Sequence, residues 1–193
     1  EVNGLVNSIT QFLNYISLIE GGLGSVIMTA LYQPLNQKKF EQVSSIIVTS
    51  NNFFRKIAKI FIGYLLLVAV FYPLIVKTNF SYGFIFSLTM ILGIGLFIQY
   101  YFAITWKLLL KADRRVYVAS GIQILVIVLN TIFTLGMIRV ASNSIHLVKL
   151  VATLAFVIQP LLYDEYVSKF YVIDKDADLN VNILKNRWDG FGI

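Results

Sequence analysis

The chain has 193 residues, of which 58% are hydrophobic and only 13% are charged, and its formal net charge is +6. About a quarter of the residues in a soluble domain are charged, so this composition excludes a protein whose whole surface faces water. The sequence has no cysteine and one histidine, His146. Disulfides and cysteine nucleophiles are therefore excluded, and we expect no metal cluster, cofactor or catalytic residues.

Long uncharged runs divide the chain. In lipid every backbone amide must be paired internally, so a spanning segment is a helix or part of a closed barrel. A helix needs about 20 apolar residues to cross, and these runs are longer than the roughly ten-residue alternating strands of a barrel. We predict an all-α integral membrane fold with about five transmembrane helices, near residues 5–32, 60–76, 80–106, 116–138 and 147–166. Pro160 should kink the last one.

The more polar segments predict how these spans are organised. Residues 33–59 change from polar to apolar along their length, which is typical of a segment that lies on the cytoplasmic surface before it enters the membrane. With this segment included, residues 1–171 are expected to form one helix bundle. Residues 172–193 are predicted to be a cytoplasmic polar linker.

The basic residues predict the orientation. Thirteen of the 16 lysines and arginines fall on one side of the predicted spans, and only Lys77, Arg139 and Lys149 fall on the other. Loops rich in lysine and arginine stay in the cytoplasm, so the N-terminus is expected outside and the C-terminus inside. The same distribution explains the positive charge without a nucleic-acid partner. An outside start without a signal peptide suggests that an earlier helix is missing.

Polar side chains fall on one face of the first span and recur in the fourth and fifth. The residues that we single out are Asn7, Gln11, Asn14, Ser17, Gln123, Asn130 and Gln159. A polar face is costly in lipid, so it must meet a wet cavity or another helix. Two interpretations stay open with equal weight: a pathway for a polar solute, such as a sugar, or hydrogen bonds between helices.

Glu20 is the one acid deep within an apolar run. At mid-bilayer it would cost about 2.5–3.5 kcal/mol on insertion scales. It could couple transport to a proton or sodium ion. The alternative is a neutral or paired acid that only packs.

Several short motifs resemble the Wzx-type oligosaccharide flippases of the multidrug/oligosaccharidyl-lipid/polysaccharide exporter superfamily. They are GGLGS at 21–25, ALYQPL at 30–35, FFRKI at 53–57 and NRWDGFG at 186–192, in that order. The resemblance implies a bundle of twelve to fourteen helices in two lobes, of which this chain supplies helices two to six. The second lobe would then be missing.

The resemblance also implies a function, the movement of undecaprenyl-diphosphate-linked oligosaccharide across the bacterial plasma membrane for cell-surface polysaccharide synthesis. The expected partners are that lipid-linked oligosaccharide, membrane lipids and the second lobe. Lys107 and Arg55 lie at helix ends that are predicted to be cytoplasmic, and they are candidates for capture of the diphosphate. The alternative that we favour for these two residues is that they are ordinary membrane anchors.

Other functions stay open. A small-molecule or drug exporter of the same superfamily would use the same fold. A membrane-embedded enzyme of polysaccharide assembly would need acidic groups near one interface, for which the sequence offers Asp164 and Glu165. A structural membrane subunit would use the polar faces only for helix contacts. We favour the flippase and expect no enzyme activity.

Overall fold

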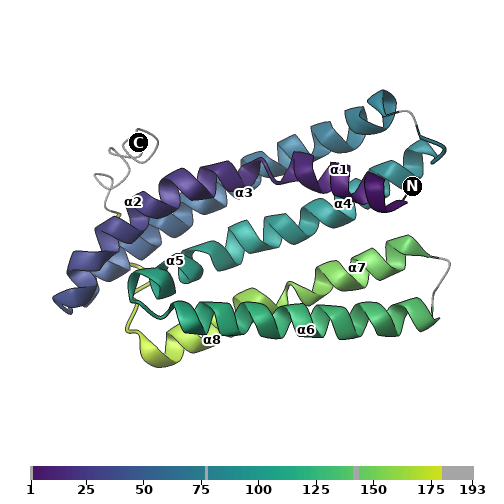
Figure 1. The fold of residues 1–193 in the computed structure, drawn as a ribbon. Coiled ribbons are helices and arrows are strands. Elements are labelled where there is room, and N and C mark those ends of the chain that lie inside the picture. The colour runs from purple at the N-terminus through teal and green to yellow at the C-terminus, as the bar shows by residue number, and fades with distance from the viewer. Residues whose placement is uncertain (1, 77, 141–143, 180–193) are drawn as a thin grey trace.

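The computed structural model describes residues 2–76, 78–140 and 144–179, except for the side chains of residues 19–21. In these ranges the chain is an elongated helix bundle without strands (Figure 1). Five helical stretches are long and apolar enough to cross a membrane: Val2–Asn36, Phe40–Ile75, Tyr82–Ala112, Val116–Val140 and Ile145–Phe170. The prediction of an all-α, multi-pass membrane protein is confirmed.

The first stretch consists of two helices, α1 (Val2–Leu13) and α2 (Ile16–Asn36), with a break between them. At the break the Ser17 amide donates to the carbonyl of Asn14, three residues back, instead of four. The Ser17 hydroxyl donates to the same Asn14 carbonyl at 2.6 Å, and the Tyr64 hydroxyl donates to the Phe12 carbonyl at 2.7 Å. Because side chains pair these carbonyls, the break can persist away from water.

The second stretch is one helix, α3 (Phe40–Ile75). The predicted boundary between an interfacial segment at 33–59 and a span at 60–76 is therefore not found: residues 33–36 end α2, and 40–75 are continuous. The sequence has no glycine or proline between 40 and 59 to interrupt the helix. At 1.5 Å per residue α3 is about 54 Å long. It thus exceeds the hydrocarbon core of about 30 Å and must project beyond it.

The third stretch joins α4 (Tyr82–Ile98), a π-helix η1 (Gln99–Ala103) and α5 (Ile104–Ala112). The fourth is α6 (Val116–Val140), and the fifth comprises α7 (Ile145–Ala155) and α8 (Ile158–Phe170). The predicted kink is confirmed, because the break at 156–157 directly precedes the turn that contains Pro160. Proline lacks the N–H that would bond to the carbonyl four residues back, here Phe156.

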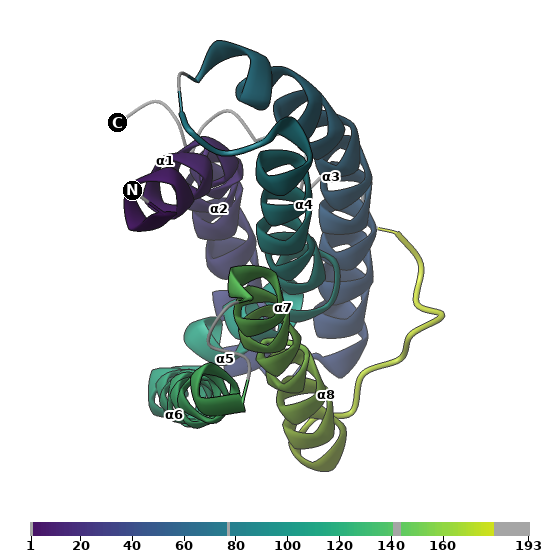
Figure 2. The same cartoon turned by 90° about the vertical axis from the view of Figure 1, so that its right-hand side faces the viewer.

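The core follows one face of α3. Its buried residues recur every three or four positions, as in Phe54, Ala58, Phe61, Leu65, Ala69 and Tyr72. Gly93 of α4 lies directly against Leu65, where any Cβ would overlap the leucine side chain. Gly95 allows a similar approach to Thr153 of α7, whose hydroxyl donates to the Ile91 carbonyl at 3.3 Å. The α4–α5 span is thereby fixed between α3 and α7 (Figure 2).

The segment after α8, residues 171–179, is hereafter called the strap. It has no helix and crosses from α8 to α3 (Figure 2). The Tyr171 hydroxyl donates to Oδ2 of Asp113, in the α5–α6 turn, at 2.5 Å. Farther along, the Asp174 amide donates to Oγ of Ser44, and the Ser45 hydroxyl donates to the Asp178 carbonyl at 2.6 Å. Residues 172–179 of the predicted linker are thus docked on the bundle, and the remainder lies outside the described residues.

Candidate functional site

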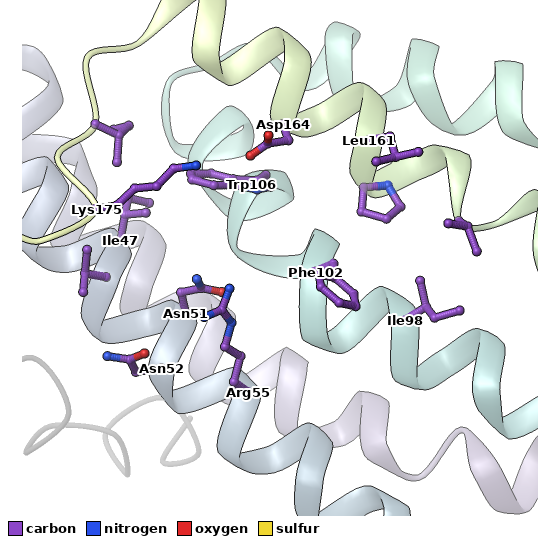
Figure 3. Close-up of a pocket in the computed structure, with 14 residues that line it drawn as sticks. Ile47, Asn51, Asn52, Arg55, Ile98, Phe102, Trp106, Leu161, Asp164 and Lys175 are labelled. Carbon is purple, nitrogen blue, oxygen red and sulfur yellow. The ribbon is translucent and has the colours of Figure 1, made fainter.

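A cavity of about 680 Å³ lies between α3, the α4–α5 span, α8 and the strap. From α3 it receives Asn51, Asn52 and Arg55, and from α8 Asp164 (Figure 3). Lys175 enters from the strap. Its apolar lining includes Ile47, Val48, Ile98, Phe102, Val157, Leu161 and Ile173, with Trp106 and Pro160 also in the wall. A cavity that combines apolar walls with a few converging polar groups is the usual form of a ligand site.

The charged groups of the cavity are not paired with one another. Within the described residues, Arg55, Lys175 and Asp164 form no ion pair, although two ion pairs are present elsewhere. The Nε atom of Arg55 is buried and has no hydrogen-bond partner there. Its guanidinium carbon lies 5.2 Å from the centre of the Tyr101 ring, a cation–π contact that holds the side chain. Buried donors without a hydrogen-bond partner are uncommon in proteins.

The strap that covers one side of the cavity is anchored by a charged cluster. Nε of Arg115 lies 2.9 Å from Oδ2 of Asp113, which also accepts from Tyr171, and Nη1 of Arg115 donates to the Tyr166 hydroxyl at 3.0 Å. Burial, followed by the hydrogen bond to Asp113, raises the pKa of Tyr171 well above its usual value. The phenol therefore stays protonated as a donor at neutral pH.

The predicted polar face on the first span lies elsewhere, on α1 and α2. Asn7, Gln11, Asn14 and Ser17 are all exposed, while Leu5, Ile9, Leu13 and Ile16 turn into the core. None of the four polar residues lines the cavity. In Figure 2 the α1–α2 span and the strap lie on opposite sides of α4. The structure thus separates two polar regions, the α1–α2 face and the cavity.

The other predicted pathway residues have different environments. Gln123 is exposed on α6, whereas Nδ2 of Asn130 donates to the Ala152 carbonyl of α7 at 2.7 Å. Gln159 is buried, and its Nε2 lies 3.4 Å from the hydroxyl of Tyr163. The bond of Asn130 to α7 fits the helix-contact interpretation, whereas that of Gln159 stays within α8. Gln123 has no such bond within the described residues.

The two candidates for diphosphate capture are not brought together. Arg55 lines the large cavity, whereas Lys107 lines a small one of about 30 Å³ with Gln159 and Tyr163. The side chain of Glu20, the predicted coupling residue, lies outside the described residues. In the described part of the chain no three histidine, aspartate or glutamate side chains are placed to hold a metal ion.

Sequence reasoning missed most of the cavity. Asn51, Trp106, Asp164 and Lys175 come from four separate segments, and no local spacing connects them. The π-helix, which supplies Phe102 to the wall, has no signature that we recognised, although such segments often mark functional sites. The cavity residue that the sequence did identify as a candidate was Arg55, as a basic residue at a predicted cytoplasmic helix end.

Comparisons with protein-family models, with curated proteins and with solved structures give no match to this chain. The fold and the two polar regions are therefore the basis for the proposals that follow.

Proposed function

We propose that the chain is one lobe of a membrane translocator that moves a lipid-linked oligosaccharide, carried on undecaprenyl diphosphate, across the bacterial plasma membrane. The exposed polar face of α1 and α2 is the main support. Four polar side chains within one membrane span are costly against lipid, so this face is expected to meet water or a second lobe. A sugar head group needs such a polar path, while its lipid tail can stay in the hydrocarbon.

The break between α1 and α2 supports the same proposal. Discontinuous helices are common at substrate sites of transporters, where polar groups beside the break can face the substrate at membrane depth. Here the break falls at Asn14 and Tyr15, and Asn14 and Ser17 of the polar face flank it.

Transport by the full polypeptide that contains this chain would test the function. The protein is reconstituted in vesicles with fluorescent undecaprenyl-diphosphate oligosaccharide, and the fraction that becomes accessible to an impermeant quencher is followed over time. We expect the double change Gln11→Leu and Asn14→Leu to slow flipping at least tenfold with unchanged protein abundance. Phe12→Leu, on the same helix, is the matched control and should flip at the parent rate.

Other outcomes of this assay would reject the proposal. If the parent protein leaves the lipid-linked sugar in place but exports a dye or drug, the chain belongs to a small-molecule exporter. If the double change and Phe12→Leu reduce abundance and flipping together, the polar face only packs against another helix.

We further propose that Glu20 couples transport to a proton or sodium ion. Coupling requires that the affinity of Glu20 for the ion differ between the inward- and outward-facing states. Glu20→Gln, which keeps the shape but cannot titrate, should remove the response of flipping to an imposed pH gradient. An unchanged response would show that Glu20 packs as a neutral acid.

The orientation is part of the proposal, with the α2–α3 and α5–α6 turns in the cytoplasm. Because the sequence lacks cysteine, single cysteines report cleanly. Asn79→Cys should react with an impermeant thiol reagent in intact cells, whereas Gln37→Cys should react only after permeabilisation. Reaction of Gln37→Cys in intact cells would reverse the orientation.

A further inference from the structure

We propose that the cavity between α3, the α4–α5 span, α8 and the strap binds the phosphate head group of an anionic lipid. This site goes beyond the proposed transport function, because it lies apart from the polar face of α1 and α2 that would carry the substrate. It is also independent of that function: the cavity could bind a lipid phosphate whether or not the chain belongs to a flippase.

The cavity is formed before any ligand arrives. Three spans supply its walls, and the strap is anchored on both sides of Lys175, by Asp174 to Ser44 and by Asp178 to Ser45. At the other end of the crossing, Tyr171 is bonded to Asp113. The backbone on either side of Lys175 is thus bonded to α3, and its exposed side chain lines the cavity. Pre-formed sites lose less entropy on binding.

The cavity lining has an apolar part and a polar part, as the binding of a lipid requires. Along the α4–α5 span it changes from Ile98 and Phe102 to Trp106, and along α8 from Leu161 to Asp164. On both helices the lining residues become more polar toward the end that approaches the α5–α6 turn or the strap. An alkyl chain can therefore lie along Ile98 and Leu161, while its head group lies in the part of the cavity between Arg55, Lys175 and Trp106 (Figure 3).

The charged side chains of the cavity favour an anionic ligand that also carries hydroxyl groups. Arg55 and Lys175 contribute two positive charges and Asp164 one negative charge, so the three together carry +1. The guanidinium fork of arginine matches the oxygens of a phosphate, and Arg55 lines the cavity without an ion pair among the described residues. Asp164 and Asn51 can accept hydrogen bonds from glycerol or sugar hydroxyls. A lipid phosphate, either a phospholipid or a polyprenyl diphosphate, has all of these features.

Trp106 provides a direct measurement of binding. The chain has two tryptophans, so Trp188→Phe leaves Trp106 as the single fluorophore, in the cavity wall. This protein is placed in phosphatidylcholine nanodiscs that contain increasing fractions of phosphatidic acid with brominated acyl chains, which quench tryptophan on contact. We expect saturable quenching by brominated phosphatidic acid, and much weaker quenching by brominated phosphatidylcholine at the same fractions.

The matched variants separate the site from general surface charge. Arg55→Gln should raise the half-saturating fraction of phosphatidic acid about tenfold, the size expected for loss of a charge-assisted hydrogen bond. Lys56→Gln removes the same charge from the next residue of α3, which is exposed and does not line the cavity, and should change it less than about twofold. Lys175→Gln, on the strap and outside the packed core, should raise the half-saturating fraction of phosphatidic acid about threefold. It tests the site even if Arg55→Gln fails to fold.

Competition identifies the source of the phosphate. Unlabelled undecaprenyl diphosphate and unlabelled phosphatidic acid are compared by the fraction of each that reverses the quenching. If undecaprenyl diphosphate acts at the lower fraction, the ligand is the polyprenyl diphosphate. Equal potency would make it a bulk anionic phospholipid. Three results would overturn the inference: equal quenching by brominated phosphatidylcholine, equal effects of Arg55→Gln and Lys56→Gln, or full reversal by inorganic pyrophosphate at the same concentration.

Discussion

Helices α3 and α6 are both long and equally hydropathic, yet they are used in opposite ways. Among the residues of their most apolar windows, 28% are buried for α3 and 6% for α6. α3 is packed along one face against α2 and α4, whereas α6 buries only Ala119 and Val126. Apolar side chains are as stable against lipid tails as against each other, so hydropathy places a helix in the membrane without saying what it contacts.

The two helices should therefore respond differently to the same substitution, and the largest contrast is expected at glycines. Gly93→Ala inserts a methyl group into the α3–α4 contact, where Leu65 is 2% exposed and must move. Overpacking of this kind costs about 1–3 kcal/mol. The thermal unfolding of detergent-solubilised protein, followed by circular dichroism, should shift clearly to lower temperature.

Gly121→Ala on α6 is the matched control for this change. No atom outside its own helix lies within 4 Å of the position that its Cβ would take. Because alanine favours the helix over glycine by up to about 1 kcal/mol, unfolding should be unchanged or shift slightly upward. Equal losses at Gly93 and Gly121 would mean that α6 is packed against something beyond this bundle.

A smaller effect is expected where α6 does make a specific contact. Asn130→Leu removes the hydrogen bond to the Ala152 carbonyl of α7. Side-chain bonds of this type between membrane helices average about 0.6 kcal/mol and reach about 1.7. Unfolding and cellular abundance should fall modestly. Gln123→Leu, on the same helix and exposed, should leave both unchanged, and a loss there would assign Gln123 a hidden partner.

The sequence predicted the parts of this architecture that depend on one segment at a time. Long uncharged runs identified five spans, Pro160 identified the break before α8, and periodicity identified the face of α1 that carries Asn7 and Gln11. The unbroken length of α3 was missed because Ser44, Ser50 and Asn51 made its first half look interfacial. In the structure Ser50 is buried and donates to the carbonyl of Ile46, so its polarity is satisfied within the helix.

The cavity could not be predicted in the same way, since its residues meet only after the spans have packed and the strap has crossed to α3. Trp106 and Lys175 are far apart in sequence, and neither lies in a pattern typical of a site. Arg55 was selected as a candidate for phosphate capture, but its partners were not. A site built from several segments requires the tertiary contacts that hydropathy and periodicity leave undetermined.

The smallest expected effect concerns the strap, which runs from α8 to α3 and is bonded on the way to Asp113 in the α5–α6 turn. Tyr171→Phe removes the hydrogen bond to Asp113, while the ring can still pack beside Arg115, whose guanidinium carbon lies 5.3 Å from its centre. A bond of this kind contributes about 1 kcal/mol. Global unfolding should hardly change, because the ring of residue 171, which packs against the core, is kept. Local opening should increase about fivefold, and trypsin cleavage after Lys175 should accelerate to the same degree near neutral pH, where the phenol is protonated. Tyr117→Phe, at the exposed start of α6, is the control and should be cleaved at the parent rate. If cleavage after Lys175 is unchanged in Tyr171→Phe, the bonds to Ser44 and Ser45 are sufficient to hold the strap, and α3 alone forms its anchor.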